Sequence, residues 1–361
     1  MRTVSLSRPS TRVWGLWLLV GTLTAFWLQL AMVRAYDGNW TSLIGVGRSS
    51  ALRAPIEEEL GTLAYSVPHG YDGRYSFLIA VDPFNHRGIA ALFDRPAYRY
   101  RRILYSFLAG GGGLFNGPTA LAGLVILAAL GIGLATAAVG SLSVRLGIRR
   151  WVVVGVLANP GVWLTVLLLT PDALALGLAL SGVLLWWDRR YTWAIVVLAL
   201  AALTKETYLL VAFSLAGWTW FRHERKRAIA LILGATAPLA LWTAWTLAAI
   251  EHGSLAGGNL ALLGVVEASR IWGTIPATER GLAIITLVGV VLAAVFATRA
   301  NSLLRWLTWP WVVLALVTSG WVWDLGNNAS RVLLPVWIFA ILSLALWFRP
   351  HRSTQPLPES G

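Results

Sequence analysis

The sequence predicts an all-α polytopic membrane protein. Of its 361 residues, 57% are hydrophobic and only 12% are charged, against roughly 25% charged residues in an ordinary soluble domain. Such a chain has too few polar residues to cover a water-soluble surface, and its composition is equally far from that of a disordered protein. The 21 Trp residues agree with this class, because the indole ring favours the membrane–water interface. The sequence contains no Cys, which excludes disulfides and thiol-based metal or nucleophilic sites.

The first transmembrane helix is predicted at residues 13–33, between Arg12 and Arg34. A spanning helix needs about 20 apolar residues, and this segment exceeds the roughly 7–15 residues of a signal-peptide core, so we expect it to be retained. The polar stretch 34–102 follows as a long outer loop. The short apolar segment 103–115 comes next and is expected to be a juxtamembrane helix at the interface.

The later apolar segments raise the prediction to about ten transmembrane helices. They lie at 119–142, 151–170, 173–187, 191–203, 207–221, 228–250, 281–298, 306–321 and 332–347. Residues 1–348 therefore form a single transmembrane domain, and the proline-containing segment 349–361 is expected to be a disordered cytoplasmic tail.

Two pairs of predicted helices are short. The pair within 151–187 is broken at Pro171-Asp172, and the pair within 191–221 is broken at Lys205-Glu206. Because two full crossings need about 40 residues, the sequence does not decide whether each pair crosses fully. For the pair within 191–221, two tilted helices that meet just below the outer surface fit the charges best. Such a break is tolerated where it lines a cavity or is packed in protein.

The charges predict the orientation of the chain. With ten spans, 16 of the 29 Lys and Arg residues and 3 of the 16 acidic residues lie on the side of the two termini. Short loops rich in Lys and Arg stay in the cytoplasm, so both termini are predicted to be cytoplasmic and the 34–102 loop to face outward. The net charge of +13 then reflects membrane orientation, and nucleic-acid binding is not expected.

A candidate catalytic residue lies in the outer loop. Asp72 stands between Gly70 and Gly73, and glycines allow a tight turn and close substrate approach. The residues that follow predict an amphipathic helix on the membrane surface, which ends at Asp82. Asp72 at this point could accept a proton from an attacking hydroxyl group. An equally good interpretation is that its side chain caps the helix by accepting from Tyr75 or Ser76.

Basic residues near the end of the outer loop are candidate phosphate ligands. Arg95 and Arg99 follow Asp94 in a segment that also contains Tyr residues, and Arg binds phosphate through two parallel N–H donors. The alternative is that the basic residues anchor the loop to anionic lipid headgroups. We favour this alternative for Arg101 and Arg102.

Polar residues also gather at the outer ends of the predicted helices. Ionisable groups at membrane depth are costly and indicate function by default. The group comprises Asn159, Asp172, Lys205, Glu206 and the segment 324–331 with Arg331. Lys205 could instead form a structural ion pair with Asp172 or Glu206, whereas Arg331 is well placed to hold an anion.

The sequence assigns no metal site. His69, Asp72, Asp82 and His86 supply donors that suit Mg²⁺ or Mn²⁺, but their spacing is not diagnostic. A divalent ion is therefore possible, and no cofactor is predicted.

The chain resembles the GT-C membrane glycosyltransferases, in a bacterial branch tied to cell-surface glycopolymer formation. The resemblance rests on the order of a first helix, a long outer loop and many short helices, and on five motifs. These are residues 70–75 with 82–84, residues 94–100, residues 170–176, residues 203–207 and residues 331–335. It implies a bacterial inner-membrane enzyme that uses a polyprenyl-phosphate-linked sugar on the outer face. The acceptor would be a glycan or a lipid.

The resemblance also implies roles for individual residues. Asp72 matches the place of the catalytic base, although many relatives carry an acidic pair there and this chain has Tyr71 and Gly73 beside it. Candidate substrate-binding residues are Arg74, Asp82, Arg95, Arg99, Lys205, Glu206 and Arg331. A transporter or flippase of lipid-linked sugars is the main alternative, but it would not need the long outer loop. A noncatalytic subunit of an assembly complex is the third.

Overall fold

The computed structural model describes residues 11–67, 70–250, 263–300 and 302–348. Within these ranges the chain is helical and forms no strand. The predicted tail 349–361 and His69 lie outside the described residues. In chain order the elements are α1 (Thr11–Ala35), η1 (Trp40–Ile44), α2 (Arg53–Leu60), α3 (Gly73–Val81), η2 (Ile89–Leu92), α4 (Pro96–Tyr100), α5 (Ile103–Gly111), α6 (Gly117–Leu146), α7 (Val152–Leu157), α8 (Pro160–Leu167), α9 (Asp172–Trp187), α10 (Tyr191–Thr204), η3 (Glu206–Tyr208), α11 (Leu209–Trp220), α12 (Arg225–Ala249), α13 (Gly264–Ser269), α14 (Ala277–Arg299), α15 (Ser302–Val317), α16 (Gly320–Trp323), α17 (Gly326–Val332) and α18 (Leu334–Trp347).

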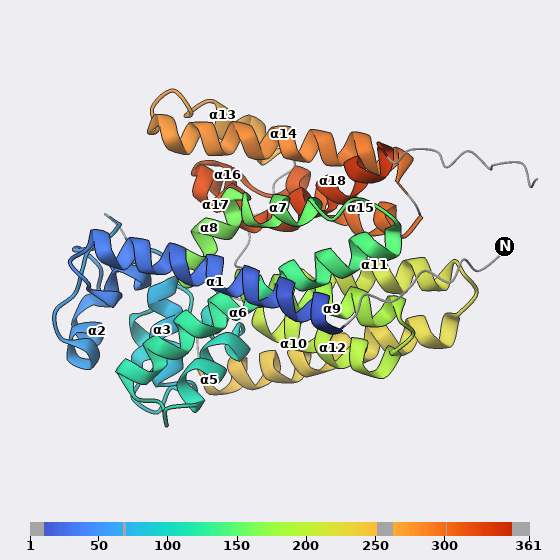
Figure 1. The fold of residues 1–361 in the computed structure, drawn as a ribbon. Coiled ribbons are helices and arrows are strands. Elements are labelled where there is room, and N and C mark those ends of the chain that lie inside the picture. The colour runs from blue at the N-terminus through green and yellow to red at the C-terminus, as the bar shows by residue number, and fades with distance from the viewer. Residues whose placement is uncertain (1–10, 68–69, 251–262, 301, 349–361) are drawn as a thin grey trace, which may run out of the picture.

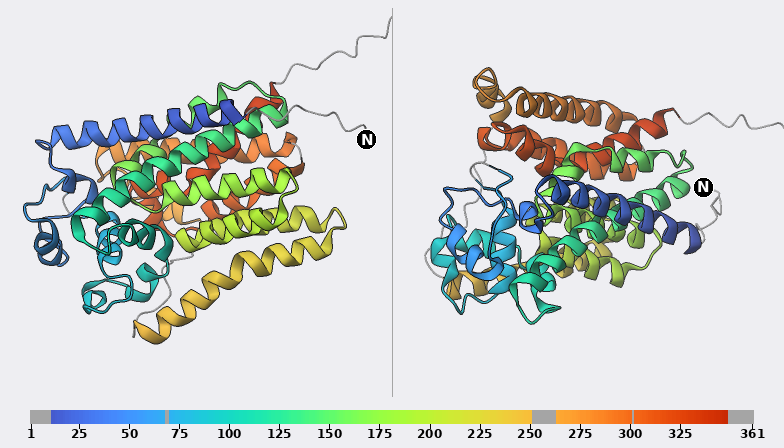
Figure 2. Two further views of the ribbon diagram at one scale, coloured as in Figure 1. Left: turned by 60° about the horizontal axis from the view of Figure 1, so that its bottom comes forward. Right: turned by 60° about the vertical axis from the view of Figure 1, so that its left-hand side comes forward.

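The longer helices run side by side along one direction and form a single bundle (Figure 1). Helix α6 packs against α1 on one side and α9 on the other. Helix α1 begins, and α18 ends, at one end of this bundle, whereas α2, α3 and α5 lie at the other end (Figure 2). The described residues of the predicted outer loop, 34–102, therefore form a compact helical layer at the end of the bundle opposite the start of α1 and the end of α18.

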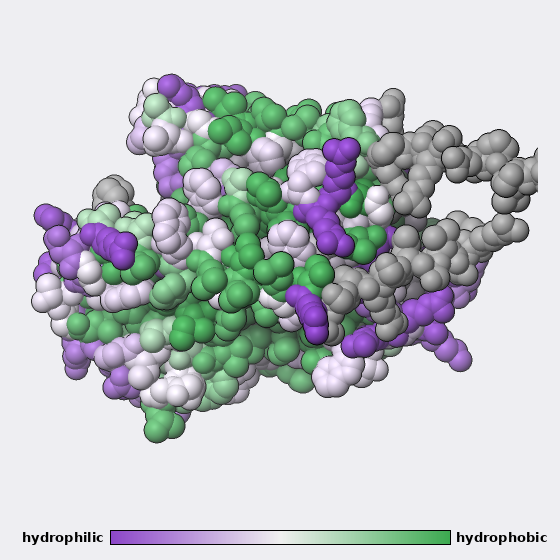
Figure 3. All heavy atoms as spheres, in the orientation of Figure 1, coloured by the Kyte–Doolittle hydropathy of each residue, from purple (hydrophilic) through white to green (hydrophobic). Residues whose placement is uncertain are grey.

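Among the described residues, four helices are long and apolar enough to cross a membrane: α1, α6, α12 and α14. The pair α17 and α18, bent by 60°, forms a fifth candidate span. In α1 apolar side chains face outward, with Leu19 and Trp27 at 54% and 64% exposed, whereas most of α6 is buried within the bundle. Figure 3 shows apolar residues over the middle of one face and hydrophilic residues toward the two ends. This distribution is typical of a protein that crosses a membrane.

The prediction of about ten spans is not confirmed. Helices α9, α10 and α15 have 16, 14 and 16 residues, which corresponds to about 21–24 Å at a rise of 1.5 Å per residue. A hydrocarbon core is about 30 Å thick, so each of the three is shorter than a helix that spans a bilayer of ordinary thickness. The predicted span 151–170 divides into α7 and α8, because Asn159 caps α8 by accepting from the Gly161 amide at 2.8 Å.

The predicted break after Thr204 is present, since η3 separates α10 from α11. By contrast, α3 is not an amphipathic helix on the surface. Eight of its nine residues are buried, because the run from Phe77 to Val81 is apolar all round and has no polar face to expose. Glycine permits the close contact that results: a Cβ atom on Gly110 of α5 would lie 1.8 Å from the Ala80 carbonyl oxygen.

Candidate functional site

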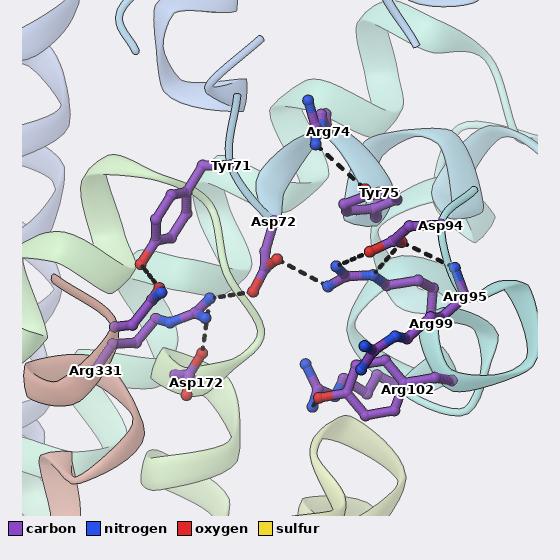
Figure 4. A network of polar contacts seen from close by, with 12 residues as sticks. Tyr71, Asp72, Arg74, Tyr75, Asp94, Arg95, Arg99, Arg102, Asp172 and Arg331 are labelled. Atoms are coloured by element: carbon purple, nitrogen blue, oxygen red, sulfur yellow. Dashed lines mark hydrogen bonds and ion pairs between the residues drawn. The ribbon is translucent and has the colours of Figure 1, made fainter. Parts of the chain in front are cut away.

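Asp72 lies at the start of α3, and its side chain points toward two arginines (Figure 4). Its Oδ1 lies 2.8 Å from Nη1 of Arg99, and its Oδ2 lies 2.6 Å from Nη1 of Arg331. The predicted capping role is wrong for the side chain, which makes no capping hydrogen bond. The backbone carbonyl of Asp72 accepts from the amides of Tyr75 and Ser76 instead. The carboxylate is thus available for ionic contacts.

The turn that presents Asp72 depends on its glycines. Gly70 has a φ of +85°, a value that L residues rarely adopt. A Cβ atom on Gly73 would lie 2.3 Å from the Leu168 carbonyl oxygen and 2.6 Å from that of Ile44. Glycine at this position therefore lets the start of α3 pack directly against the end of α8.

Arg99 on α4 is fixed by two carboxylates and a ring. Its Nε and Nη2 donate to the two carboxylate oxygens of Asp94 at 3.1 and 2.9 Å. Its guanidinium also lies over the ring of Tyr75, 4.0 Å from the centroid. Because these contacts orient the planar group, Arg99 is a preorganised cation beside Asp72.

Arg331 on α17 reaches the same carboxylate from the opposite side. It is only 6% exposed, and its Nη1 is 3.8 Å from Oδ2 of Asp172. Its guanidinium also lies over the ring of Tyr71, whose hydroxyl donates to Asn328 at 2.9 Å. The Nε group of Arg331 is buried without a hydrogen-bond partner. A buried N–H without a partner costs about 1–3 kcal/mol, so this group has capacity to bind a ligand or water.

Lys205 forms a buried ion pair with Asp172. The pair joins the break after α10 to the beginning of α9, and both side chains are almost completely inaccessible. The structure therefore contains the structural ion pair that the sequence left as an alternative. Through Asp172, this pair also lies next to Arg331.

Glu206, which follows Lys205 in the same helix break, pairs with two arginines of the outer loop. Its carboxylate accepts from Nε and Nη2 of Arg102 at 2.9 and 2.7 Å, and Arg101 Nη2 lies at 3.1 Å. Arg102 also donates to the hydroxyl of Tyr98. Glu206 thus pairs with both arginines, and their contact with anionic lipid headgroups stays a prediction.

The other predicted binding residues lie outside this network. Arg74 donates to the hydroxyls of Ser50 and Tyr75 and points away from Asp72 (Figure 4). Both carboxylate oxygens of Asp82 accept backbone N–H groups, from His86 and Arg87, and hold the turn after α3. Arg95 precedes α4, and its side chain makes no ion pair within the described residues. Of the predicted set, the structure brings together Asp72, Arg99, Lys205, Glu206 and Arg331.

Two opposing effects set the protonation of Asp72. Burial alone would raise its pKa, but the guanidinium groups of Arg331 and Arg99 lower it, and the net result is a pKa well below the ordinary value. The Arg99 pKa is raised: burial lowers it, but Asp72 and Asp94 more than compensate. At neutral pH the site therefore contains a carboxylate between two guanidinium ions.

The space around Asp72 is small. A cavity of about 20 Å³ adjoins its side chain and those of Ser76, Arg99 and Arg102. Roughly 10–15 Å³ of this measure holds one water molecule, so the cavity accepts a water but no sugar. A bound sugar would require movement of one of the arginines.

A much larger apolar groove begins on the other side of Glu206. It has a volume of about 680 Å³ and lies among α11, α12 and α15. Leu210, Phe213 and Leu239 contribute to its walls, and Arg101 lies at its polar end with Glu206 and Thr207. The hydroxyl of Thr207 is buried without a hydrogen-bond partner. One end of this apolar groove therefore reaches the edge of the charged network.

No protein-family model matches the chain, and comparisons with curated proteins and with solved structures find no significant similarity. The resemblance to GT-C enzymes therefore rests on the sequence motifs alone. Within the described ranges, no group of three or more His, Asp or Glu residues is arranged to hold a metal ion, and His69 lies outside those ranges.

Sequence reasoning missed Asp94, Tyr71 and Asn328 as parts of the network. Asp94 precedes α4 and Arg99 lies within it, five residues later. The helical turn between them brings the two side chains close together. Asn328 and Arg331 are three residues apart and so share a face of α17. Helical spacing alone would have found this second pair.

Proposed function

We propose that the protein is a membrane glycosyltransferase. It moves a sugar from a polyprenyl-phosphate carrier to a glycan or lipid acceptor on the outer face of the bacterial inner membrane. The observation that carries the proposal is the position of Asp72, a half-buried carboxylate between two guanidinium groups, close to the polar end of an apolar groove. These are the three parts that a lipid-linked sugar phosphate requires: a base, cations and a site for the chain.

The charge balance of the network supports an anionic ligand. The network contains five cations and four carboxylates, all within the described residues. They are Arg99, Arg101, Arg102, Lys205 and Arg331, with Asp72, Asp94, Asp172 and Glu206. One positive charge is uncompensated, and the buried Nε of Arg331 has no partner. A bound phosphate would compensate this charge and could accept a hydrogen bond from the Nε group of Arg331.

The groove supports a lipid rather than a soluble donor. Its walls are mainly apolar, and Arg101 lies at one end. An isoprenoid chain in the groove would place its phosphate near Arg101 and Glu206, next to Arg102, which also lines the small cavity beside Asp72. Burial of apolar surface contributes roughly 25 cal/mol per Å², so the chain would supply much of the binding energy.

In the proposed reaction the donor phosphate takes Arg99 or Arg331 away from Asp72. The released carboxylate then accepts the proton of the acceptor hydroxyl as the oxygen attacks the anomeric carbon. The bond between that carbon and the phosphate oxygen breaks, and its electron pair leaves with the lipid phosphate. Arginines already in place stabilise the charge that develops on the phosphate.

The test uses purified full-length protein with polyprenyl-phosphate sugars and a lipid-phosphate release assay. Asp72→Asn preserves the shape of the side chain and removes the base. We expect normal accumulation in the membrane and a loss of transfer of about 10²–10⁴-fold. Glu57→Gln is the matched control, because Glu57 is another acid of the outer loop and pairs only with Arg53 and Tyr65. Full activity of Asp72→Asn, or donor binding by the wild type without any release, would reject the enzymatic proposal.

A further inference from the structure

The turn between α9 and α10 lies at the end of the bundle where α1 begins (Figures 1 and 2), and a second pocket adjoins this turn, away from Asp72. It forms where the turn between α9 and α10 meets the turn between α11 and α12. Its volume is about 280 Å³, near the lower limit of roughly 300 Å³ for small-molecule sites. Trp186, Trp187 and Trp218 line it together with Arg189, Arg222 and the acidic residue Glu224.

The apolar wall of this pocket is firmly built. Trp186 is 3% exposed, and its indole Nε1 donates to the Thr219 hydroxyl at 3.2 Å. Its ring packs edge-on against Tyr191, with centroids 4.8 Å apart. Buried aromatic rings with satisfied polar atoms have few alternative positions, so the pocket is preformed rather than a gap between mobile side chains.

The two arginines of the pocket lack acidic partners. Asp188 accepts from Arg145 at 2.9 and 2.7 Å, and Glu224 pairs with Arg227 at 2.5 Å. The nearby carboxylates are therefore committed to other arginines. In the part of the chain that the structure describes, Arg189 and Arg222 form no ion pair.

Two exposed arginines carry the positive charge of this pocket. The backbone of Arg189 is fixed at the end of α9, where its φ is +59° and its amide donates to the Trp186 carbonyl at 3.0 Å. The guanidinium of Arg222 lies over the Trp218 ring, 4.8 Å from the centroid. Two guanidinium groups beside an aromatic wall suit a ligand that is anionic at one end and apolar at the other.

We propose that this pocket binds a phosphate-bearing ligand, with the phosphate between Arg189 and Arg222 and the remainder against the tryptophans. Arg binds phosphate through paired N–H donors, and tryptophans favour the level of lipid headgroups. The phosphate comes either from an anionic lipid headgroup or from a soluble phosphate compound. This site is independent of the proposed transferase function, because it shares no residue with the Asp72 network.

The test compares two double variants of the full-length protein that change the net charge equally. Arg189→Ala with Arg222→Ala removes the pocket cations. Arg190→Ala with Arg225→Ala removes neighbouring exposed arginines that do not line the pocket. Binding of phosphatidylglycerol is counted by native mass spectrometry from nanodiscs, with phosphatidylcholine as the neutral-lipid comparison. Inorganic phosphate is titrated separately, and size-exclusion profiles check that both variants fold.

We expect the pocket variant to bind the anionic ligand at least tenfold more weakly, and the control variant to bind within about twofold of the wild type. Loss of phosphatidylglycerol alone identifies the lipid as the source of the phosphate, whereas loss of inorganic phosphate binding identifies a soluble ligand. Equal losses in the two variants would show attraction by net charge only. That result, or unchanged binding in the pocket variant, would overturn the proposal.

Discussion

Replacing Lys205 with Met tests how the buried pair between Lys205 and Asp172 contributes to stability. The two side chains are 3% and 1% exposed, and removing one partner of a buried pair costs about 3–5 kcal/mol because the other charge is left uncompensated. Arg331 lies 3.8 Å from Asp172 and retains part of the attraction. We therefore expect Lys205→Met to lower the free energy of unfolding by about 3 kcal/mol, at the lower end of that range.

The measurement is equilibrium unfolding in mixed detergent micelles, with increasing amounts of dodecyl sulfate. The double variant Lys205→Met with Asp172→Asn removes the uncompensated charge. It should be more stable than the sum of the single changes predicts, by about 1–3 kcal/mol. Additive effects of the two changes would refute the ion-pair reasoning. A stable Lys205→Met protein with weaker donor binding would instead assign Lys205 to the substrate.

Three further predictions concern other parts of the molecule. Arg331→Ala should raise the apparent donor constant about 10–150-fold, and Arg331→Lys should raise it less; equal affinity of the Lys variant and the wild type would remove Arg331 from the phosphate site. Because the pKa of Asp72 is lowered well below its ordinary value in the folded state, its contribution to stability is fully present above the unfolded value of about 3.9 and is lost progressively as the pH falls from there through the lower folded pKa. The difference in unfolding free energy between wild type and Asp72→Asn should therefore be constant from pH 7 to about 5 and should begin to narrow between about pH 4 and 3; a difference that widens there would contradict this. Finally, a cysteine at position 58 should react with an impermeant thiol reagent from outside and one at position 225 should not; external labelling at 225 would exclude the predicted topology.

Composition and hydropathy were sufficient to predict the fold class. The apolar segments and the low charge predicted an all-α chain with membrane-crossing helices, and the breaks at Pro171 and Lys205 were visible as polar interruptions. The number of crossings could not be predicted in the same way. Helix α10 is shorter than a helix that spans a bilayer of ordinary thickness, and whether such a helix forms half of a span depends on its packing against neighbours.

The candidate site was predicted in part. Asp72 was selected for its place between two glycines of the outer loop, and Arg331 because ionisable groups at membrane depth are costly, but their contact joins residues 259 positions apart in the chain. Helical periodicity predicts contacts between residues three or four positions apart, and it gives no information about a contact between two distant segments. The burial of α3 was missed for a related reason, because a short apolar run suits either a membrane surface or a packed interior. The glycines that decide between these alternatives act through contacts with distant backbone atoms.

The short helices have a consequence for the surrounding lipid. Trp193 and Val196 on α10 are 65% and 43% exposed, as lipid-facing side chains are, and the 14 residues of the helix measure about 21 Å along the axis. Hydrocarbon about 30 Å thick adapts to a lipid-facing helix of this length by local thinning or by snorkelling of the flanking residues, at a cost of fractions of a kcal/mol per Å. A thinner bilayer beside α10 shortens the path between the two headgroup layers on this face. Hydrophobic mismatch would then make the protein sensitive to acyl-chain length, with greater stability in shorter-chain lipids.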